Sequence, residues 1–349
     1  MEKFCVFCGQ KPTQKNNEHV IPQWLLELSG RPDRPAFFGF DHKGSEFSSR
    51  IFSFDSFKFP ACKDCNENFG RIEDAVKNVI VRLKSQNVIL GKDVSLLLDW
   101  LDKIRIGLWL ALYYLSKNQM NIKPPRFHIS TRMAMKDRMV AIYESDASGF
   151  KINFEGVDSP VFSLSPSCFT LRLGYIALFN ASCDFLVSRR CGFPYPMTVE
   201  RLNDDGLYNY TLAPGLERAI FPIIRLPLIH TSWQFYQPIF AANLMTKNEM
   251  CQSLYSTPYV LRHSLDFDKG IGNVFTQNNG RIGLISQEVE YRIGELQYET
   301  AWLSKRLKDQ TLSIQAQLLE QLPVSALVRK VAAQNRRWMK LPYLGAQGK

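Results

Sequence analysis

The sequence predicts an α+β fold, because helical and strand-like hydrophobic spacing occupy different parts of the chain. Apolar residues recur every three or four positions over 76–120 and again over 286–340, which is the spacing of amphipathic helices. Over 125–230, short runs of Phe, Ile, Val and Tyr alternate with Gly, Pro, Ser and Asp, as strands and turns do. The chain has 349 residues, 45% of them apolar, which suffices for one large domain or two ordinary ones.

Spacing in the first helical region predicts two helices separated near Gly91. The most apolar segment, 104–116, is too short to span a bilayer, and the charged residues Asp102 and Lys103 lie at its start. We therefore expect a buried helix there. The C-terminal helical region is interrupted at Leu322-Pro323, since proline cannot continue a helix.

The middle region predicts a mixed or antiparallel sheet of short strands. The runs that carry this signal are 126–131, 139–143, 150–154, 161–164, 169–173 and 185–187. A helix around 171–180 is an alternative for part of the region. Residues 203–229 continue as short strands and loops, because their prolines exclude a long helix.

The formal net charge of +10 would attract the chain to polyanions such as nucleic acid or an anionic membrane surface. Residues 1–10 lack the apolar core of a secretory signal, because Glu2, Lys3 and Cys5 interrupt it. We therefore expect a cytoplasmic protein that does not enter a membrane. Cysteines stay reduced in that compartment, so closely spaced cysteines indicate metal binding rather than disulfides.

Two CxxC pairs stand out among the cysteines, Cys5 with Cys8 and Cys62 with Cys65. A two-residue spacer forms a tight turn that directs both thiolates to one point, and two such turns complete a four-cysteine zinc site. Zinc would supply much of the folding free energy of a segment with little core, on the order of 10 kcal/mol in zinc-finger peptides. Two unrelated pairs of thiols are the alternative. The other cysteines lie in contexts typical of free core thiols: Cys168, Cys183, Cys191 and Cys251.

Between the pairs lies Asn17-Glu18-His19-Val20-Ile21-Pro22, and the second pair runs directly into Asn66-Glu67-Asn68-Phe69-Gly70-Arg71-Ile72-Glu73. The order of elements is CxxC, EHxxP, CxxCN and then a helix with a glycine and an acidic residue. In this order the chain resembles HNH endonucleases that carry a CxxC pair on each side of the active site. The resemblance covers residues 1 to about 75.

This resemblance implies a ββα-metal fold over residues 1–75, in which a β-hairpin packs on one helix. A structural zinc on the four cysteines would lie apart from a catalytic divalent ion. His19 matches the general-base histidine, and Glu18 matches the acidic neighbour that binds the ion. Asn66 matches the His or Asn after the second pair. Residues 76–349 would form a larger α+β domain of unrecognised fold with a substrate-binding or regulatory role.

Phosphodiester hydrolysis requires the same residue types. An imidazole has a pKa suited to deprotonating water near pH 7, and oxygen ligands suit Mg²⁺ or Mn²⁺ as the catalytic ion. On a helix that follows Cys65, residues 66 and 73 share one face. Glu73 is therefore expected to join Glu18 and Asn66 at the catalytic ion.

Two positions depart from the family pattern. Many HNH sites place a second ligand four residues after the first on this helix, where this chain has Gly70. The middle Asn, which orients the histidine, is not visible before the second pair, and Asp55 or Ser56 is the substitute that the sequence offers.

His42 lies in Asp41-His42-Lys43-Gly44, which predicts a solvated hairpin tip.

The sequence thus predicts a metal-dependent endonuclease whose partner is nucleic acid, DNA rather than RNA. Standalone HNH proteins of this kind resemble effectors of bacterial anti-phage systems, which implies a regulatory protein partner. A toxin-like ribonuclease would use the same site on another substrate. The alternative of a different class is a non-catalytic zinc protein that binds nucleic acid or a partner.

Basic residues gather near the C-terminus, in the segment 329–340 with Trp338. Such a segment could grip a nucleic-acid strand, although a solvated helix face is the simpler interpretation. His128, His230 and His263 lack ligand spacing and are expected to be structural.

Overall fold

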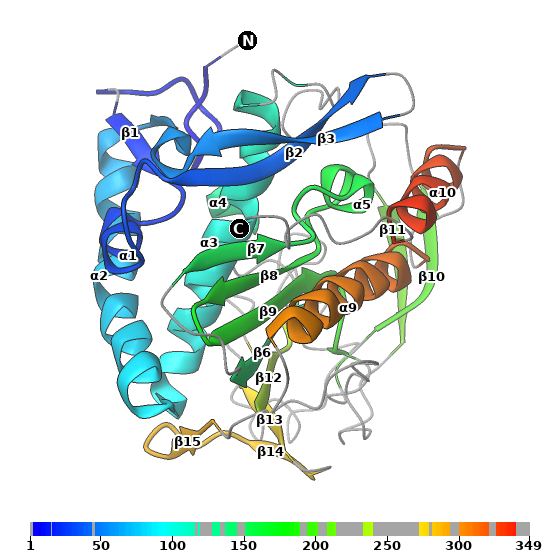
Figure 1. Ribbon diagram of the computed structural model, residues 1–349. Coiled ribbons are helices and arrows are strands. Elements are labelled where there is room, and N and C mark those ends of the chain that lie inside the picture. The colour runs from blue at the N-terminus through cyan, green and yellow to red at the C-terminus, as the bar shows by residue number, and fades with distance from the viewer. Residues whose placement is uncertain are drawn as a thin grey trace.

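The computed structural model places a sheet between helices and sets a smaller strand-strand-helix unit beside it (Figure 1). The residues that the structure describes are 3–14, 16–43, 46–115, 118, 128–132, 137–144, 151–188, 193, 195–201, 208–213, 233–239, 272–278, 281–293, 300–320 and 326–339.

The larger sheet has seven strands, all paired antiparallel, in the order β14, β13, β12, β6, β9, β8, β7. Their bounds are β6 Asp137–Glu144, β7 Ile152–Glu155, β8 Cys168–Leu173, β9 Ile176–Cys183, β12 Trp233–Gln237, β13 Phe275–Asn278 and β14 Arg281–Leu284. The β8–β9 hairpin turns through two residues, of which the first is Gly174 at φ 65°. Glycine suits that position because a positive φ is costly for other residues.

Two long helices, α3 (Val94–Tyr114) and α9 (Thr300–Glu320), cover opposite faces of this sheet (Figure 1). On β9, Asn180 accepts a hydrogen bond from Arg105 of α3. On β8, Thr170 bonds Thr311 of α9 at 2.7 Å between hydroxyl oxygens. Thr170 lies opposite Phe179 in the strand pair, so these two side chains share one face of the sheet. Asn180 follows Phe179 in β9 and therefore points to the other face. The sheet is therefore buried on both sides.

The N-terminal unit consists of an antiparallel pair, β1 (Asn16–His19) and β4 (Lys58–Ala61), followed directly by α2 (Lys63–Gln86). His19 lies opposite Lys58 in the pair. Strand alternation turns Glu18 to the buried side of β1 and His19 to the half-exposed side. The helix ends at Asn87, whose left-handed backbone (φ 53°) is a common helix terminator.

Shorter elements surround these units, and three strand pairs among them are antiparallel: β2 with β3, β5 with β15, and β10 with β11. Their bounds are α1 Gln23–Leu28, β2 Pro35–Lys43, β3 Glu46–Ser53, η1 Phe54–Ser56, β5 Val88–Leu90, η2 Gly91–Asp93, α4 Ile129–Arg132, α5 Pro160–Leu164, β10 Tyr195–Arg201, β11 Tyr208–Ala213, β15 Glu290–Arg292 and α10 Ala326–Met339.

A single apolar core joins the N-terminal unit to α3. Helix α2 continues past residue 75, and its buried residues Val76 and Ile80 belong to the same core as Leu101 of α3. At Gly107 the helix comes so close to β1 that an added Cβ would lie 2.5 Å from a methyl carbon of Val20. Within the described residues, no helix combines the length and apolarity needed to cross a membrane.

The α+β class predicted from the sequence is confirmed. The two helices expected around Gly91 are α2 and α3, and the apolar segment at 104–116 lies largely in the buried part of α3. Three strand-like runs are confirmed as β6, β7 and β8. The hairpin expected around His42 is β2 with β3, and residues 44 and 45 at its tip lie outside the described residues.

Other local predictions were wrong for identifiable reasons. The strand expected at 161–164 is helix α5, because the Ser159 hydroxyl caps it and accepts a hydrogen bond from Phe162 N at 3.0 Å. The alternative helix around 171–180 is the β8–β9 hairpin.

Three further segments differ from their sequence predictions. Residues 129–132 are helix α4 rather than the end of a strand. Residues 185–187 form turns and bends, beginning with Phe185 in a left-handed conformation (φ 53°). The region from 286 onward, which its spacing predicts to be helical, contains the strand β15, which pairs with β5. Pairing with a distant strand overrides local propensity there.

Replacing Gly107 by Ala is predicted to destabilise the protein by about 1–3 kcal/mol, because the new methyl group would overlap Val20. Gly70 in α2 is the matched control, since nothing lies within 4 Å of its added Cβ. There, alanine should stabilise by up to about 1 kcal/mol through its higher helix propensity. Denaturant unfolding of both variants measures the difference, and equal effects would contradict the close packing of α3 on β1.

Candidate metal centre and histidine site

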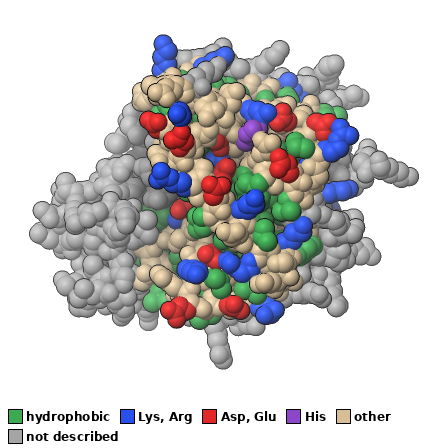
Figure 2. All heavy atoms as spheres, turned by 90° about the vertical axis from the view of Figure 1, so that its left-hand side faces the viewer, with side chains coloured by type: hydrophobic (Ala, Val, Ile, Leu, Met, Phe, Trp, Pro, Cys, Tyr) green, Lys and Arg blue, Asp and Glu red, His purple; other side chains and the backbone are tan. Residues whose placement is uncertain are grey.

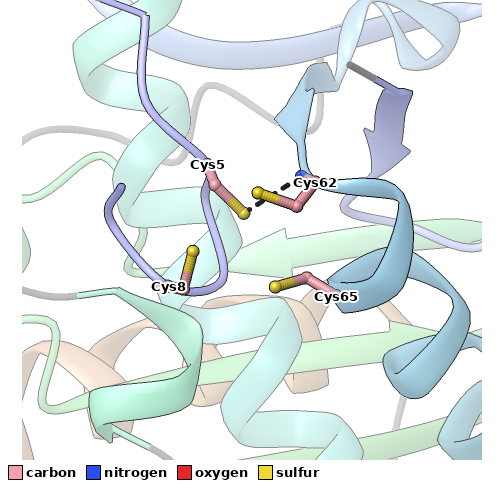
Figure 3. A group of neighbouring side chains, drawn as sticks. All are labelled: Cys5, Cys8, Cys62 and Cys65. Atoms are coloured by element: carbon pink, nitrogen blue, oxygen red, sulfur yellow. Dashed lines mark hydrogen bonds between the residues drawn. The ribbon is translucent and has the colours of Figure 1, made fainter. Parts of the chain in front are cut away.

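The first cysteine pair lies in a tight N-terminal turn (Figure 3). Gly9 N donates to the Cys5 carbonyl at 2.8 Å, and Cys5 N donates to the Gln10 carbonyl at 2.8 Å. Gly9 has φ 76°, and the ring of His128 fills the space that a side chain would occupy there. These contacts hold Cys5 and Cys8 on one side of a loop.

The second pair lies at the start of α2, where Cys62 is the residue before the helix and Cys65 is in its first turn. Cys62 N donates to Cys5 Sγ at 3.3 Å, and Thr13 N donates to Cys62 Sγ at 3.3 Å. Backbone N–H groups that point at sulfur favour the thiolate. The two pairs therefore face each other across a short gap (Figure 3).

All four Sγ atoms lie within 4.8 Å of one another. A tetrahedral zinc ion with Zn–S bonds of about 2.3 Å needs sulfurs about 3.8 Å apart, so this spacing fits a metal ion such as zinc. The sequence prediction that the two pairs converge is confirmed. It is also the only such group of metal-binding side chains found among the described residues.

The thiols differ in their electrostatic surroundings. Hydrogen bonding with Thr13 is the main cause that lowers the pKa of Cys62 to about 7. Burial raises the pKa of Cys65 to about 12. Without a cation, Cys65 would stay protonated at neutral pH. A bound dication would stabilise the thiolates, so that metal binding releases protons.

His19 lies at the end of β1 and faces the loop before β4. Its Nε2 is 3.7 Å from Asp55 Oδ1, and the Lys58 ammonium is 2.7 Å from the same oxygen. Asp55 lies in η1, where its N–H donates hydrogen bonds to the Ser53 hydroxyl oxygen and to the Pro32 carbonyl, each at 3.1 Å. Of the two substitutes that the sequence offered for the family's middle Asn, Asp55 is the residue beside His19.

Burial lowers the pKa of the His19 imidazole, and the nearby Lys58 charge acts in the same direction. The carboxylates of Asp55 and Glu18 oppose this shift without reversing it. The imidazole is therefore neutral at pH 7 and can accept a proton. Its side chain retains 25% exposure while Nε2 itself is buried, so solvent reaches other atoms of the ring.

Glu18 and Glu73 converge, but on an ammonium group. Lys103 of α3 donates hydrogen bonds to Oε1 of Glu18 and to Oε1 of Glu73. It also donates to the His19 carbonyl at 3.3 Å. Its side chain is fully buried, and those of Glu18 and Glu73 are 6% and 17% exposed.

The charges of this triad depend on one another. Burial alone would lower the pKa of Lys103, but the Glu18 and Glu73 carboxylates outweigh it and raise that pKa. Burial raises the pKa of Glu73 to about 7, with the ammonium acting in the opposite direction. The lysine is therefore charged at neutral pH, and its charge holds the two carboxyl groups together.

Asn66, the third expected ligand, lies in the first turn of α2 and is half-buried. Within the described part of the chain, its side chain makes no hydrogen bond. Between it and Glu73, Phe69 stacks on Phe7 with ring centroids 4.2 Å apart. The structure thus brings Glu18 to Glu73, and among the described residues no side-chain hydrogen bond joins Asn66 to either.

Sequence reasoning missed Lys103. A lysine in the apolar spacing of 96–113 was a usable signal, because a charged residue inside a helix that is buried all round must find a partner. Local spacing identifies Lys103 only as a charge at the start of an apolar segment. Its partners lie 85 and 30 positions away, which no local pattern indicates.

Other residues considered from the sequence contribute little to this site. His128 packs its ring against Phe4 in an edge-on contact beside the first cysteine pair. His230, His263, Cys191 and Cys251 lie outside the described residues, as does the His42 side chain. Cys168 is buried and Cys183 half-buried, and neither forms a disulfide. On α10, the exposed basic residues are Arg329, Lys330, Arg336 and Arg337.

The surface over α2 carries acidic and basic side chains intermingled, as Figure 2 shows for the face on the α2 side. The net positive charge is thus not gathered into a continuous basic patch among the described residues of this face.

Comparison with known proteins gives no relative. No family model matches the chain, and neither the curated proteins nor the solved structures include a significant match.

The purified protein is predicted to contain about one zinc ion per chain, and Cys62→Ala should lose it together with much of its stability. The ion would crosslink the N-terminal turn to α2, and zinc binding supplies on the order of 10 kcal/mol in small zinc domains. Elemental analysis and thermal unfolding measure both effects. Cys168→Ala is the matched control, since this buried thiol lies outside the cluster. Metal-free natural protein of unchanged stability would contradict the prediction.

Proposed function

We propose that the protein is an endonuclease that hydrolyses phosphodiester bonds of DNA, with His19 as the general base. The observation that carries the proposal is the half-exposed, neutral His19 beside Asp55, at the end of a strand in a strand-strand-helix unit. The four-cysteine cluster at the start of the same helix supports it as well. The resemblance in sequence order to HNH endonucleases supplies the reaction and the choice of DNA.

The contacts of His19 suit proton transfer. The Asp55 carboxylate lies 3.7 Å from the buried Nε2, which is too far for a hydrogen bond. Its negative charge still favours the proton of the neutral ring on that nitrogen, so Nδ1 keeps a lone pair. In the proposed step, a water oxygen attacks phosphorus while its proton passes to Nδ1. The bond from phosphorus to the 3′ oxygen breaks, and that oxygen takes a proton from solvent. Lys58, bonded to Asp55, would attract the phosphate to this edge of β1 and β4.

In the nucleases that the chain resembles, a divalent ion such as Mg²⁺ or Mn²⁺ polarises the phosphoryl oxygen and stabilises the leaving oxygen. The expected ligands here are Glu18, Asn66 and Glu73. As the side chains lie, this set does not fit a second cation, because both carboxylates already bond the Lys103 ammonium. The proposed chemistry of this chain therefore runs through His19, Asp55 and Lys58 alone.

The hydrogen bonds of Glu18 and Glu73 with Lys103 favour a second candidate function. In it, the zinc-bound unit binds nucleic acid or a protein partner without cutting. The mixed charge of the α2 face is compatible with a protein partner. A role in anti-phage defence, controlled by a regulatory protein, belongs to the first candidate and is supported by the resemblance only.

His19→Ala is predicted to reduce DNA cleavage by a factor of about 10²–10⁴, the usual contribution of a general base. Nicking of supercoiled plasmid by the full-length protein measures this, with Mg²⁺, with Mn²⁺ and without added divalent ion. Asp33→Asn is the control, because among the described residues this exposed carboxylate pairs with Arg31 rather than with His19, Asp55 or Lys58. Parallel assays on RNA separate a ribonuclease from a deoxyribonuclease.

A folded, zinc-containing natural protein that cuts neither DNA nor RNA under these conditions would reject the nuclease and favour the binding protein. Cleavage that persists in His19→Ala would reject His19 as the base.

Asp55 is predicted to act as a positioning residue for His19. Asp55→Ala should lower kcat by roughly tenfold with little change in KM, because the imidazole loses the group that favours its productive tautomer. Asp55→Asn should restore most of the rate, since an amide oxygen can still face Nε2. Equal losses in both variants would indicate that the negative charge matters and the orientation does not.

A further inference from the structure

The ammonium of Lys103 has the oxygen neighbours that a small cation would have. Its partners are Glu18 Oε1 and the His19 carbonyl on β1, and Glu73 Oε1 on α2. An ammonium has three protons to donate, and three acceptors surround it. The group is fully buried, so its positive charge is neutralised inside the protein rather than by water.

We propose that this ammonium takes the place of the divalent ion between Glu18 and Glu73, so that the natural protein binds neither Mg²⁺ nor Mn²⁺ there. The resemblance in sequence assigns these carboxylates to a catalytic ion, and the structure gives them a cation from the chain itself. The ammonium occupies this position whether or not the protein cuts DNA.

Packing keeps the ammonium in position. Gly107 lies one helical turn after Lys103, so both residues face the N-terminal unit. At Gly107 an added Cβ would come 2.5 Å from Val20, so α3 approaches β1 about as closely as glycine permits. Lys103 cannot withdraw toward the sheet without exposing its charge to the apolar core, which is costly for an unpaired ammonium.

Electrostatics disfavours a second cation beside the first. A divalent ion bonded to Glu18 and Glu73 would lie within a few ångströms of the ammonium, and like charges repel strongly in a desolvated site. The ammonium itself cannot bind a phosphoryl oxygen, because its side chain has no exposed surface and its protons face protein oxygens. It stabilises the carboxylates but replaces none of the ion's chemistry.

Strand alternation supports the same conclusion. Glu18 points to the buried side of β1, whereas His19 points to the half-exposed side. A cation held by Glu18 and Glu73 would therefore lie on the inner side of the strand. The imidazole and Asp55 lie on the side that solvent reaches.

The test is a titration of the zinc-loaded, full-length protein with MnCl₂, with free Mn²⁺ followed by electron paramagnetic resonance. The natural sequence should bind no Mn²⁺ up to roughly 1 mM, where exposed carboxylates begin to bind divalent ions weakly. Lys103→Met should bind about one Mn²⁺ per chain, with an affinity at least roughly tenfold higher. Adding Glu73→Gln to this variant should abolish the binding. Lys77→Met, on the exposed side of α2, is the matched control.

Thermal unfolding gives an independent measurement. Lys103→Met should unfold at a temperature several degrees lower, because two buried carboxylates lose their counter-charge, and Mn²⁺ should restore part of the loss. Neither Mg²⁺ nor Mn²⁺ should shift the unfolding temperature of the natural protein. Zinc content is measured alongside, so that exchange at the cysteines is not mistaken for binding at this site.

Two results would overturn the inference. One is stoichiometric Mn²⁺ binding by the natural protein that Glu18→Gln abolishes. The other is a folded Lys103→Met variant that binds no Mn²⁺. If Lys103→Met does not fold, the titration of the natural protein and of Glu18→Gln decides alone. A failed plasmid assay leaves these measurements unaffected, so the two proposals can be rejected separately.

Discussion

The buried ion pairs of Lys103 hold β1, α2 and α3 in one arrangement. Glu18 is buried and the Glu73 side chain keeps only 17% exposure, so water stabilises neither carboxylate fully and both depend on the ammonium between them. Removing one partner of such a buried group typically costs about 3–5 kcal/mol, because the remaining charge is left uncompensated. Two residues further along α3, Arg105 bonds Asn180 of the sheet. The charged residues of this apolar helix are thus the points at which each neighbouring unit is attached.

The cysteine cluster makes a complementary link. It joins the N-terminal turn to the first turn of α2, while Lys103 joins the later part of α2 to β1 and α3. Cys5 and Cys62 also belong to the apolar core that extends through α3. A metal ion held by these cysteines would therefore stabilise the same unit that core packing stabilises. This explains how a short strand pair, which is marginal in isolation, can hold a histidine in a fixed position.

Local features of this protein could be predicted from its sequence, and distant pairings could not. The CxxC spacing indicated the cluster because each pair is a local turn, and the apolar period located α2 and α3. Ser159 is a usable signal for α5, which the β-rich composition around it outweighed, and Gly174 is a usable signal for a turn against the alternative helix at 171–180. Glu18 and His19 were recognised by order along the chain. The lysine that pairs with Glu18 lies 85 positions away, and nothing local to either residue indicates it.

Adjacent residues in a strand have separate environments, and this separation determines what the site can do. An acidic residue next to a histidine suggests a shared site in sequence, yet in β1 the carboxylate faces an internal ammonium and the imidazole faces Asp55. A base needs a neutral ring with access to solvent, which His19 has. A metal ligand needs a negative charge that no other cation neutralises, whereas the Glu18 carboxylate already bonds the Lys103 ammonium through Oε1. The general base of the proposed reaction can therefore persist in this chain without the ion that accompanies it in the nucleases it resembles, and the positive charge nearest the substrate would be that of Lys58.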